Sequence, residues 1–405
     1  MHIPQVSDSW DFARARRFRG LVTALSMVVV LSSCSLGGSS DSQGAVTSQN
    51  AEIAQSEDTV QPTPFTLRVD TPVPTHTPTI SPTVEATAAG PPSPVVIPSE
   101  RIPTVDALLA SQDGVYGVVI LDQNGAYLYA RNADVPFIAA SLYKLVLLAD
   151  IYAKVETGAL SLDMAIPLLP EYFDSQFAEE DGYYLLEDEG TETSLESALF
   201  GAGAYSSNIA AQALLDQTSV ESLRATAETL GMLDTWFNVA PSEDIPGWPN
   251  RFLDDNNPYS ERAVAFIDEQ AEFNRLHITT PNDVAHYWYL LATGEVVSAD
   301  ASAAILEILR QQVVTDRIPF LLPEGFVTAN KTGNLYHVVH DSGLISGPDG
   351  AVIVAALSQD EPDDDLGAQI IQRVGLAAVG IYDLPSFTAD HFSPPESPEA
   401  NDVSQ

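Results

Sequence analysis

A serine three residues before a lysine, at the start of an apolar helical segment, could form a nucleophile and its base. The segment reads AASLYKLVLLADIYAKVETG (139–158), and its spacing places Ser141 and Lys144 on one helical face. A serine hydroxyl is a poor nucleophile until a base removes its proton, and lysine serves as that base only when its pKa falls. The leucines and valine around Lys144 favour the burial that lowers a lysine pKa. The alternative is that Ser141 caps the helix and Lys144 lies on the surface.

Two further polar motifs follow along the chain. The sequence contains three lysines, and one of them begins KTG (331–333) at a predicted strand end. The stretch YSSN (205–208) lies in a helical region after a Gly-Ala-Gly segment that favours a bend. On such a bend the Ser206 hydroxyl and the Asn208 amide could face one cleft. The alternative for this stretch is a polar helix start.

The elements that must position these residues lie in a predicted folded region, 101–386. GVYGVVILDQNGAYLYARN reads as two strands around a turn, and GFVTANKTG, HDSGLISG and AVIVAALSQ read as three later strands. Helical patterns fill residues 159–310, and a closing helix follows the last strand. We therefore predict an α+β fold: an antiparallel sheet of about five strands from both chain ends, flanked by helices, with an inserted all-helical lobe. A cleft between sheet and lobe is the expected place for a site.

The three motifs together resemble the Ser-x-x-Lys, Ser-x-Asn and Lys-Thr-Gly set of class A β-lactamases and penicillin-binding proteins. PFIAASLYKLVLLADIY is similar to the family's nucleophile helix, ITTPNDVAHYWYLLATGE to its Thr-Thr-Pro helix, and KTGNLYHVVHDSGLISGPDGAVIVAALSQ to its final strands. The resemblance covers nearly all of 101–386. It implies a β-lactamase/transpeptidase-like fold and a serine hydrolase that needs neither a cofactor nor a metal.

The resemblance implies catalytic roles for three residues. Ser141 would attack a carbonyl carbon and become acylated, and Lys144 would be a candidate base for that step. Ser206 would relay a proton toward the leaving nitrogen.

The resemblance also implies a substrate-binding set. Its members are Asn208, Lys331, Thr332, Gly333 and Asn334. Lys331 and Thr332 would bind a substrate carboxylate, and Asn208 would hold Lys144 and the substrate amide. Backbone N–H groups of Ser141 and Asn334 would form an oxyanion hole, typically worth ~3 kcal/mol per donor.

The chain departs from the family pattern where the acyl-enzyme is hydrolysed. The middle motif carries Ser207 in place of aspartate, and the Glu-x-x-x-Asn loop has no clean copy before residue 280. QAEFN (270–274) has glutamine where glutamate belongs. The available acids are Glu243, Glu261, Asp268, Glu269 and Glu272, and the sequence does not choose among them. Two activities therefore stay open: hydrolysis of β-lactams or related amides and esters, or a penicillin-binding, D-alanyl carboxypeptidase-like protein that stays acylated.

Other site classes have weaker support. His337, His340 and Asp341 offer only two imidazoles for a metal. A Ser-His-Asp triad at Ser342 lacks the Gly-x-Ser-x-Gly elbow. A non-catalytic lipoprotein that binds cell-wall ligands is the remaining alternative, although binding alone needs no nucleophile and base.

The chain begins with an export pattern. Residues 1–33 combine an arginine-rich start with a short apolar core, and Leu-Ser-Ser-Cys ending at Cys34 resembles a bacterial lipobox. Residues 34–100 are rich in Ser, Thr and Pro and predict a disordered tether, and residues 387–405 predict a disordered tail. We expect an exported protein whose lipidated Cys34 anchors it to the outer face of the cell membrane.

The charge balance excludes one class of partner. The chain has 56 acidic and 17 basic residues, a formal net charge of −39. Nucleic-acid binding needs a basic surface, so we expect none. We expect a monomer that acts on a small-molecule or peptidoglycan-derived substrate.

Overall fold

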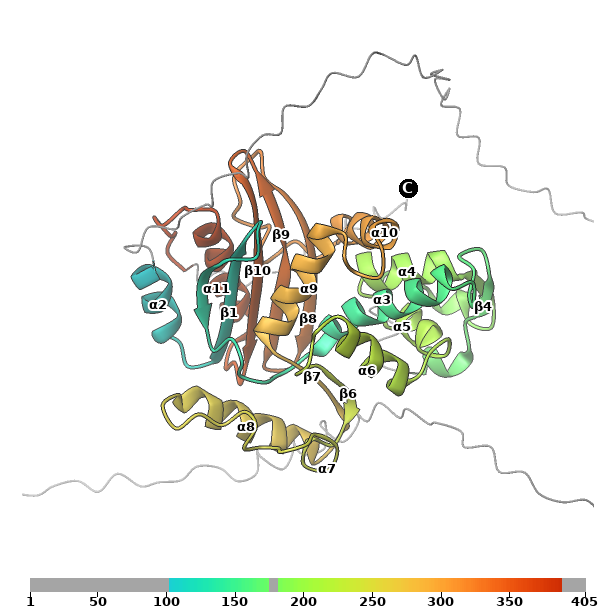
Figure 1. Ribbon diagram of the computed structural model, residues 1–405, viewed down its shortest axis with the longest axis horizontal. Helices are drawn as coiled ribbons and strands as arrows, with labels where there is room; N and C mark the ends of the chain where they lie inside the picture. Colours follow the sequence, from blue (N-terminus) through green and yellow to red (C-terminus); the bar gives the residue numbers. More distant parts are fainter. Residues whose placement is uncertain (1–101, 175–180, 388–405) are drawn as a thin grey trace, which may run out of the picture. The chain divides into compact units, whose positions relative to one another are not determined.

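A five-stranded antiparallel sheet forms the centre of the protein (Figure 1). The computed structural model describes residues 102–174 and 181–387. The strand order is β2-β1-β10-β9-β8. The strands are β1 (Val115–Asp122), β2 (Tyr127–Arg131), β8 (Val327–Leu335), β9 (Val338–Gly347) and β10 (Gly350–Gln359). Because β1 pairs with β10, the two ends of the folded region close one sheet, as the sequence predicted.

Both faces of this sheet are buried. On β1, Val118 and Ile120 join one hydrophobic cluster, whereas Val119 and Leu121 join the other, because alternate side chains point to opposite faces. The first cluster includes helices α2 (Ile102–Ala110) and α11 (Asp364–Ala378). The second includes α9 (Pro281–Thr293), which packs against β1, β9 and β10 (Figure 1).

The remaining helices lie between β3 and β8 in the chain. Five of them form a lobe and pack around the second cluster. These helices are α3 (Tyr143–Glu156), α4 (Leu195–Ala204), α5 (Asn208–Leu215), α6 (Val220–Thr229) and α10 (Ala299–Arg310). Two others, α7 (Pro241–Asp244) and α8 (Pro258–Ala271), contact each other, and α8 contributes side chains to a third, smaller cluster (Figure 1). Short 3-10 helices are η2 (Ala140–Leu142), η3 (Pro170–Tyr172) and η4 (Leu186–Asp188).

The prediction of an all-helical lobe is wrong. Two short strands, β4 (Ala165–Pro167) and β5 (Glu192–Ser194), pair within it. A second sheet has the order β3-β7-β6, with strands β3 (Phe137–Ile138), β7 (Leu276–Thr279) and β6 (Trp236–Val239). Strands of two to four residues are too short to display an alternating pattern in the sequence.

Several predicted features lie outside the described residues. These are the signal peptide 1–33, the lipidation site Cys34, the tether 34–100 and all but the first residue of the tail 387–405. Over the described ranges, no helix combines the length and the apolar character needed to cross a bilayer.

Candidate active site

Ser141 lies on a short turn that two sheets hold in place. It is the middle residue of η2, which joins β3 to α3, and it is half-buried. The Ala139 N–H donates to the His277 carbonyl oxygen at 2.8 Å, which ties the turn to β7. Ala140 adopts φ +46, an uncommon conformation for a residue with a side chain. Leu142 occupies the N-cap of α3, so Ser141 does not cap this helix.

Lys144 is fully buried beneath this turn. Its relative exposure is 0 %, which rules out the surface-lysine alternative. Its amine donates to the Ser206 carbonyl oxygen and, at 2.9 Å, to Asn208 Oδ1. Burial lowers the pKa of Lys144 to about 7, against the opposing charge of Asp181. An amine with this pKa is partly unprotonated at neutral pH.

Ser206 lies on the bend between α4 and α5. It adopts φ +59, and Ser207 after it begins α5 by accepting a hydrogen bond from Ala210 N at 2.9 Å. The predicted bend is therefore present, although the glycines before it serve another purpose. They lie inside α4, where a side chain at Gly201 or Gly203 would collide with neighbouring side chains.

Lys331 reaches the same place from the sheet. It is fully buried on β8 and donates to Ser206 Oγ at 2.7 Å and to the Thr332 carbonyl oxygen at 2.8 Å. Burial, and then the positive charge of Lys144, hold the pKa of Lys331 well below its ordinary value. Two amines from distant parts of the chain thus meet at Ser206.

The residues after Lys331 run along η2. Thr332 is buried at 4 % exposure. A Cβ built on Gly333 would lie 3.2 Å from the Ala139 carbonyl oxygen and 3.2 Å from Ala140 Cβ, so this strand passes directly against the Ser141 turn. Asn334 is exposed and stands opposite Val339 in the β8–β9 register.

The geometry therefore joins three distant segments. Lys144, Ser206, Asn208 and Lys331 form one hydrogen-bonded cluster that links α3, the α4–α5 bend and β8. Adjoining it is the Ser141 turn, which contacts β8. A half-buried serine on a turn that adjoins a cluster with two buried amines is an arrangement suited to acyl transfer.

The family comparison agrees with this arrangement. The sequence model of the Beta-lactamase enzyme family matches residues 101–383, more than half of the chain. The chain belongs to the β-lactamase enzyme family. It is thereby a serine hydrolase of the β-lactamase and penicillin-binding protein superfamily. No match was found among curated proteins.

Solved structures show the same fold. A β-lactamase from Sphaerobacter thermophilus is 25% identical, with a TM-score of 0.54 over 69% of this chain and 94% of that one. PBP-A is 20% identical, with a TM-score of 0.55 over 69% and 94%. A β-lactamase from Burkholderia vietnamiensis is also 20% identical, with a TM-score of 0.55 over 69% and 95%. The predicted β-lactamase/transpeptidase-like fold is confirmed.

The five acids considered for the deacylating base lie apart from the amine cluster. Their side chains are all exposed, on or beside α7 and α8: Glu243, Glu261, Asp268, Glu269 and Glu272. Asp268 accepts a hydrogen bond from Trp248 Nε1 at 2.8 Å. These five have no hydrogen bond to the lysine cluster, so the structure singles out none of them.

Sequence reasoning missed Asp181 and His277. Asp181 accepts hydrogen bonds from Ser207 and from the start of α5, and His277 stacks on Tyr143 with ring centroids 4.3 Å apart. Asp181 lies in an ordinary acidic stretch far from every motif, so only the unusual Ser207 hinted at a missing carboxylate. His277 lies on a four-residue strand that carried no pattern.

The other predicted sites do not assemble. His340 Nε2 bonds the Ile138 carbonyl oxygen at 2.8 Å, whereas His337 bonds the Glu361 carbonyl oxygen. Ser342 is buried and accepts a hydrogen bond from Trp288 Nε1 at 2.9 Å. Within residues 102–174 and 181–387, no three His, Cys, Asp or Glu side chains form a group that could hold a metal.

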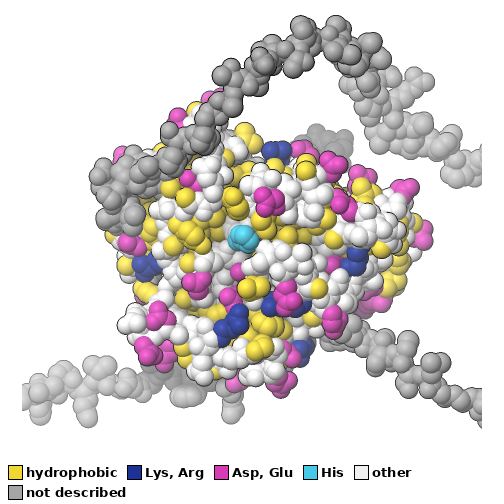
Figure 2. All heavy atoms as spheres, viewed as in Figure 1, with side chains coloured by type: hydrophobic (Ala, Val, Ile, Leu, Met, Phe, Trp, Pro, Cys, Tyr) yellow, Lys and Arg dark blue, Asp and Glu magenta, His cyan; other side chains and the backbone are white. Residues whose placement is uncertain are grey.

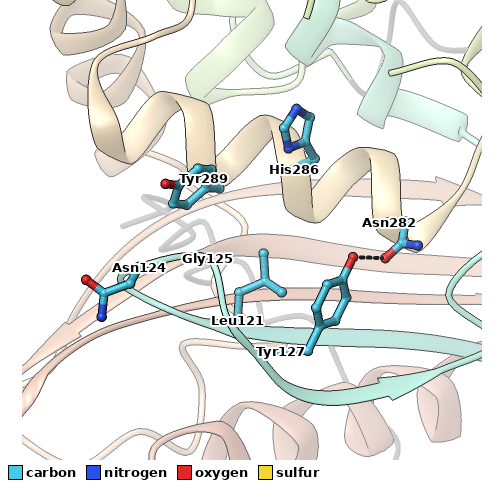
Figure 3. Close-up of a pocket in the computed structure, with 7 residues that line it drawn as sticks. All are labelled: Leu121, Asn124, Gly125, Tyr127, Asn282, His286 and Tyr289. Atoms are coloured by element: carbon cyan, nitrogen blue, oxygen red, sulfur yellow. Dashed lines mark hydrogen bonds between the residues drawn. The ribbon is translucent and has the colours of Figure 1, made fainter. Parts of the chain in front are cut away.

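A separate surface pocket lies between the β1–β2 hairpin and α9 (Figure 3). Its volume is about 340 Å³. The residues that line it are Leu121, Asn124, Gly125, Tyr127, Asn282, His286 and Tyr289. None of these seven is a predicted site residue, so this pocket is distinct from the lysine cluster.

Proposed function

We propose that this protein is an exported serine hydrolase that opens β-lactams, or cleaves related amides or esters, through an acyl-enzyme at Ser141. The observation that carries this proposal is the pair of buried amines at Ser206. Lys331 donates to its hydroxyl at 2.7 Å, and Lys144 donates to its carbonyl oxygen. Burying two amines lowers the stability of the fold. A role for these amines in proton transfer during catalysis would explain why they are buried.

The hydrogen bonds of Lys144 favour its role as the base. A neutral amine has two N–H donors and one lone pair. Both donors are used, one by the Ser206 carbonyl oxygen and one by Asn208 Oδ1. The lone pair is therefore directed away from these two acceptors. In the proposed step it takes the Ser141 proton while Ser141 Oγ bonds to the carbonyl carbon, and the carbonyl oxygen gains the negative charge.

The second half of acylation uses Ser206. Its Oγ accepts from Lys331, so its own proton is free to be donated. As the tetrahedral intermediate collapses, the carbon–nitrogen bond breaks and the nitrogen takes the Ser206 proton. The proton that Lys144 took from Ser141 then passes to Ser206 Oγ, so both groups return to their starting protonation states. Lys331 and Thr332 would bind a substrate carboxylate, as in the family resemblance.

One observation favours slow release of the acyl group. The five candidate acids are exposed and make no hydrogen bond to the cluster, so a base for the hydrolytic water is not evident among them. One solved relative, a point mutant of PBP-A, is described as an acyl-enzyme complex with penicillin G. We propose that β-lactams acylate this protein faster than the adduct is hydrolysed.

Intact-protein mass after exposure to a fluorescent penicillin tests the proposal. We expect one adduct at Ser141 that is lost in Ser141→Ala. A parallel time course of nitrocefin hydrolysis separates the two activities, since steady turnover marks a β-lactamase and a single burst marks a penicillin-binding protein. Absence of any Ser141-dependent adduct, with penicillin and with a fluorophosphonate, would refute the acyl-enzyme.

We also propose that Cys34 carries lipid and that the protein lies on the outer face of the membrane. The support is the sequence pattern before Cys34. Radiolabelled palmitate should label the wild-type protein and spare Cys34→Ala. Equal labelling of both would contradict the anchor.

A further inference from the structure

The middle residue of the Ser-Ser-Asn motif is Ser207, where the family carries aspartate. In the structure, a carboxylate from another part of the chain contacts this serine. Ser207 is buried at 1 % exposure, and its hydroxyl donates to Asp181 Oδ1 at 2.7 Å. Asp181 precedes Ser207 by 26 residues. The aspartate that the family motif carries between its serine and asparagine is thus replaced by a serine that binds a distant aspartate.

Asp181 also satisfies the first backbone donors of α5. Its Oδ2 accepts from Asn208 N at 2.8 Å and from Ile209 N at 3.0 Å. Its Oδ1 accepts from Tyr184 N at 3.1 Å, and the residue is buried at 7 % exposure. Helix N-termini leave such donors unpaired and favour negative charge, so this carboxylate holds α5 firmly at its start.

The segment that Asp181 holds is the one that contacts both amines. Ser206 stands immediately before Ser207 at φ +59, and a strained conformation persists only when its surroundings enforce it. The acceptors for Lys144 are the Ser206 carbonyl oxygen and the Asn208 side chain, on either side of the anchored Ser207. A shift of this bend would move both acceptors and the Ser206 hydroxyl together.

Asp181 also supplies the opposing charge near Lys144. Near Lys144 lie Lys331 from β8 and His277 from β7, both cations when protonated, and the Tyr143 ring on its own helix. Lys331 in turn is acted on by the charges of Asp341 and Arg317. The negative charge of Asp181 raises the pKa of Lys144 against the effect of burial. Removing it should leave Lys144 harder to protonate.

We propose that Asp181 is a positioning residue of the acylation site, and that it takes over the part of the missing motif aspartate by holding the Ser206–Asn208 bend. This inference rests on the proposed function for its kinetic consequence, although its electrostatic consequence is independent of acylation.

The test compares two changes at this contact. Asp181→Asn should slow acylation by fluorescent penicillin about tenfold or more, because small displacements at a reacting centre are costly. The acid limb of its pH–rate profile should move to lower pH by about one unit, the lower end of the range for a neighbouring charge. The double variant Asp181→Ser, Ser207→Asp returns the carboxylate to the family's own position and should restore most of the rate and the midpoint.

A matched control removes another carboxylate at the opposite end of the same helix. Asp216 accepts the Tyr172 hydroxyl at the C-cap of α5. Asp216→Asn should alter thermal stability without moving the pH midpoint. If Asp181→Asn keeps both the wild-type rate and midpoint, or if the folded double variant recovers neither, the inference is wrong.

Nuclear magnetic resonance of lysine-labelled protein separates this inference from the proposed function. The sequence has three lysines, so three signals are expected, and Lys154→Arg identifies one of them. The Lys144 signal should titrate at lower pH in Asp181→Asn and return toward the wild-type value in the double variant. A wild-type protein that is never acylated would refute the function, whereas an unchanged Lys144 titration would refute the role of Asp181.

Discussion

At the scale of single residues, the site depends on two lysine amines whose pKa values are lowered. Lys144 and Lys331 both have 0 % exposure, and burial lowers the pKa of each. Surface lysines keep their protons near neutral pH and cannot act as bases. Lys144 is the residue whose pKa, about 7, matches the demands of general-base catalysis.

Lys144→Arg should abolish rapid acylation. A guanidinium stays protonated, so the variant keeps a positive charge and loses the base, and we expect a loss of about 10²- to 10⁴-fold. In the wild-type protein, the acylation rate should rise with pH and level off above pH 7. Stopped-flow fluorescence with a labelled penicillin measures both. Lys154→Arg, on the same helix but in an ion pair with Asp150, should keep the wild-type rate.

The same lysine should make folding stability depend on pH. Its folded pKa, about 7, lies below the ordinary value of 10.5, so the unfolded chain binds more protons between these limits. Stability from this group therefore rises with pH across that window, by up to about 1.4 kcal/mol per pH unit for one proton. Urea unfolding near pH 7 and near pH 9 should show a steeper gain for the wild type than for Lys144→Met. Parallel slopes would contradict a depressed pKa.

At the scale of elements, catalysis depends on how closely β8 passes η2. Gly333 leaves little room for a side chain beside Ala139 and Ala140, and both η2 and the α4–α5 bend hold non-glycine residues at positive φ. Such backbone strain is common at functional sites, where the surrounding structure enforces it. The strand therefore sets the distance between Lys331 and the Ser141 turn.

Gly333→Ala should reduce acylation more than it reduces stability. The new methyl group would lie 3.2 Å from the Ala139 carbonyl oxygen, so we expect the Ser141 turn to shift by a few tenths of an ångström. We expect a loss of roughly tenfold or more, since misplacement near 1 Å costs about a hundredfold. Gly375→Ala on α11 is the control, because its Cβ would lie 2.8 Å from the Ile318 carbonyl oxygen. That variant should lower the melting temperature yet keep the acylation rate; equal rates in both would contradict the argument.

At the scale of the whole molecule, the acidic surface contrasts with a site built around two lysine side chains. The formal net charge is −39, and acidic side chains far outnumber basic ones on the face that Figure 2 shows. Such a surface repels anions over about a Debye length, whereas hydrogen bonds from Lys331 and Thr332 would hold a carboxylate in the proposed site. For an anionic substrate, the acidic surface therefore slows the approach to the protein, whereas contacts inside the site favour binding.

Salt should therefore speed acylation by an anionic penicillin. Screening weakens the long-range repulsion more than the contacts inside the site, so the second-order rate constant should rise a few-fold between about 0.01 M and about 0.15 M ionic strength. A neutral ester of the same penicillin, whose carboxylate is masked, should show no such rise. A rate that falls with salt would mean that the local field of the lysines dominates.

The sequence by itself determined the outline of this protein. Apolar runs bounded by turn residues predicted the sheet closed by both chain ends, because β1, β9 and β10 are long enough for such runs to be visible. The Ser141, Ser206 and Lys331 motifs could be found because lysine is scarce in this chain. The short strands around the site could not, because two to four residues display no period.

Only the tertiary structure decided what surrounds these motifs. Burial of Lys144 and Lys331, and their meeting at Ser206, depend on packing between segments far apart in the chain. Asp181 lies in an acidic stretch that resembles many others in the sequence. Its role could not be predicted, because a hydrogen bond between residues 26 positions apart leaves no local pattern. Local sequence shows which side chains can do chemistry, whereas their pKa values arise from neighbours that only the folded chain supplies.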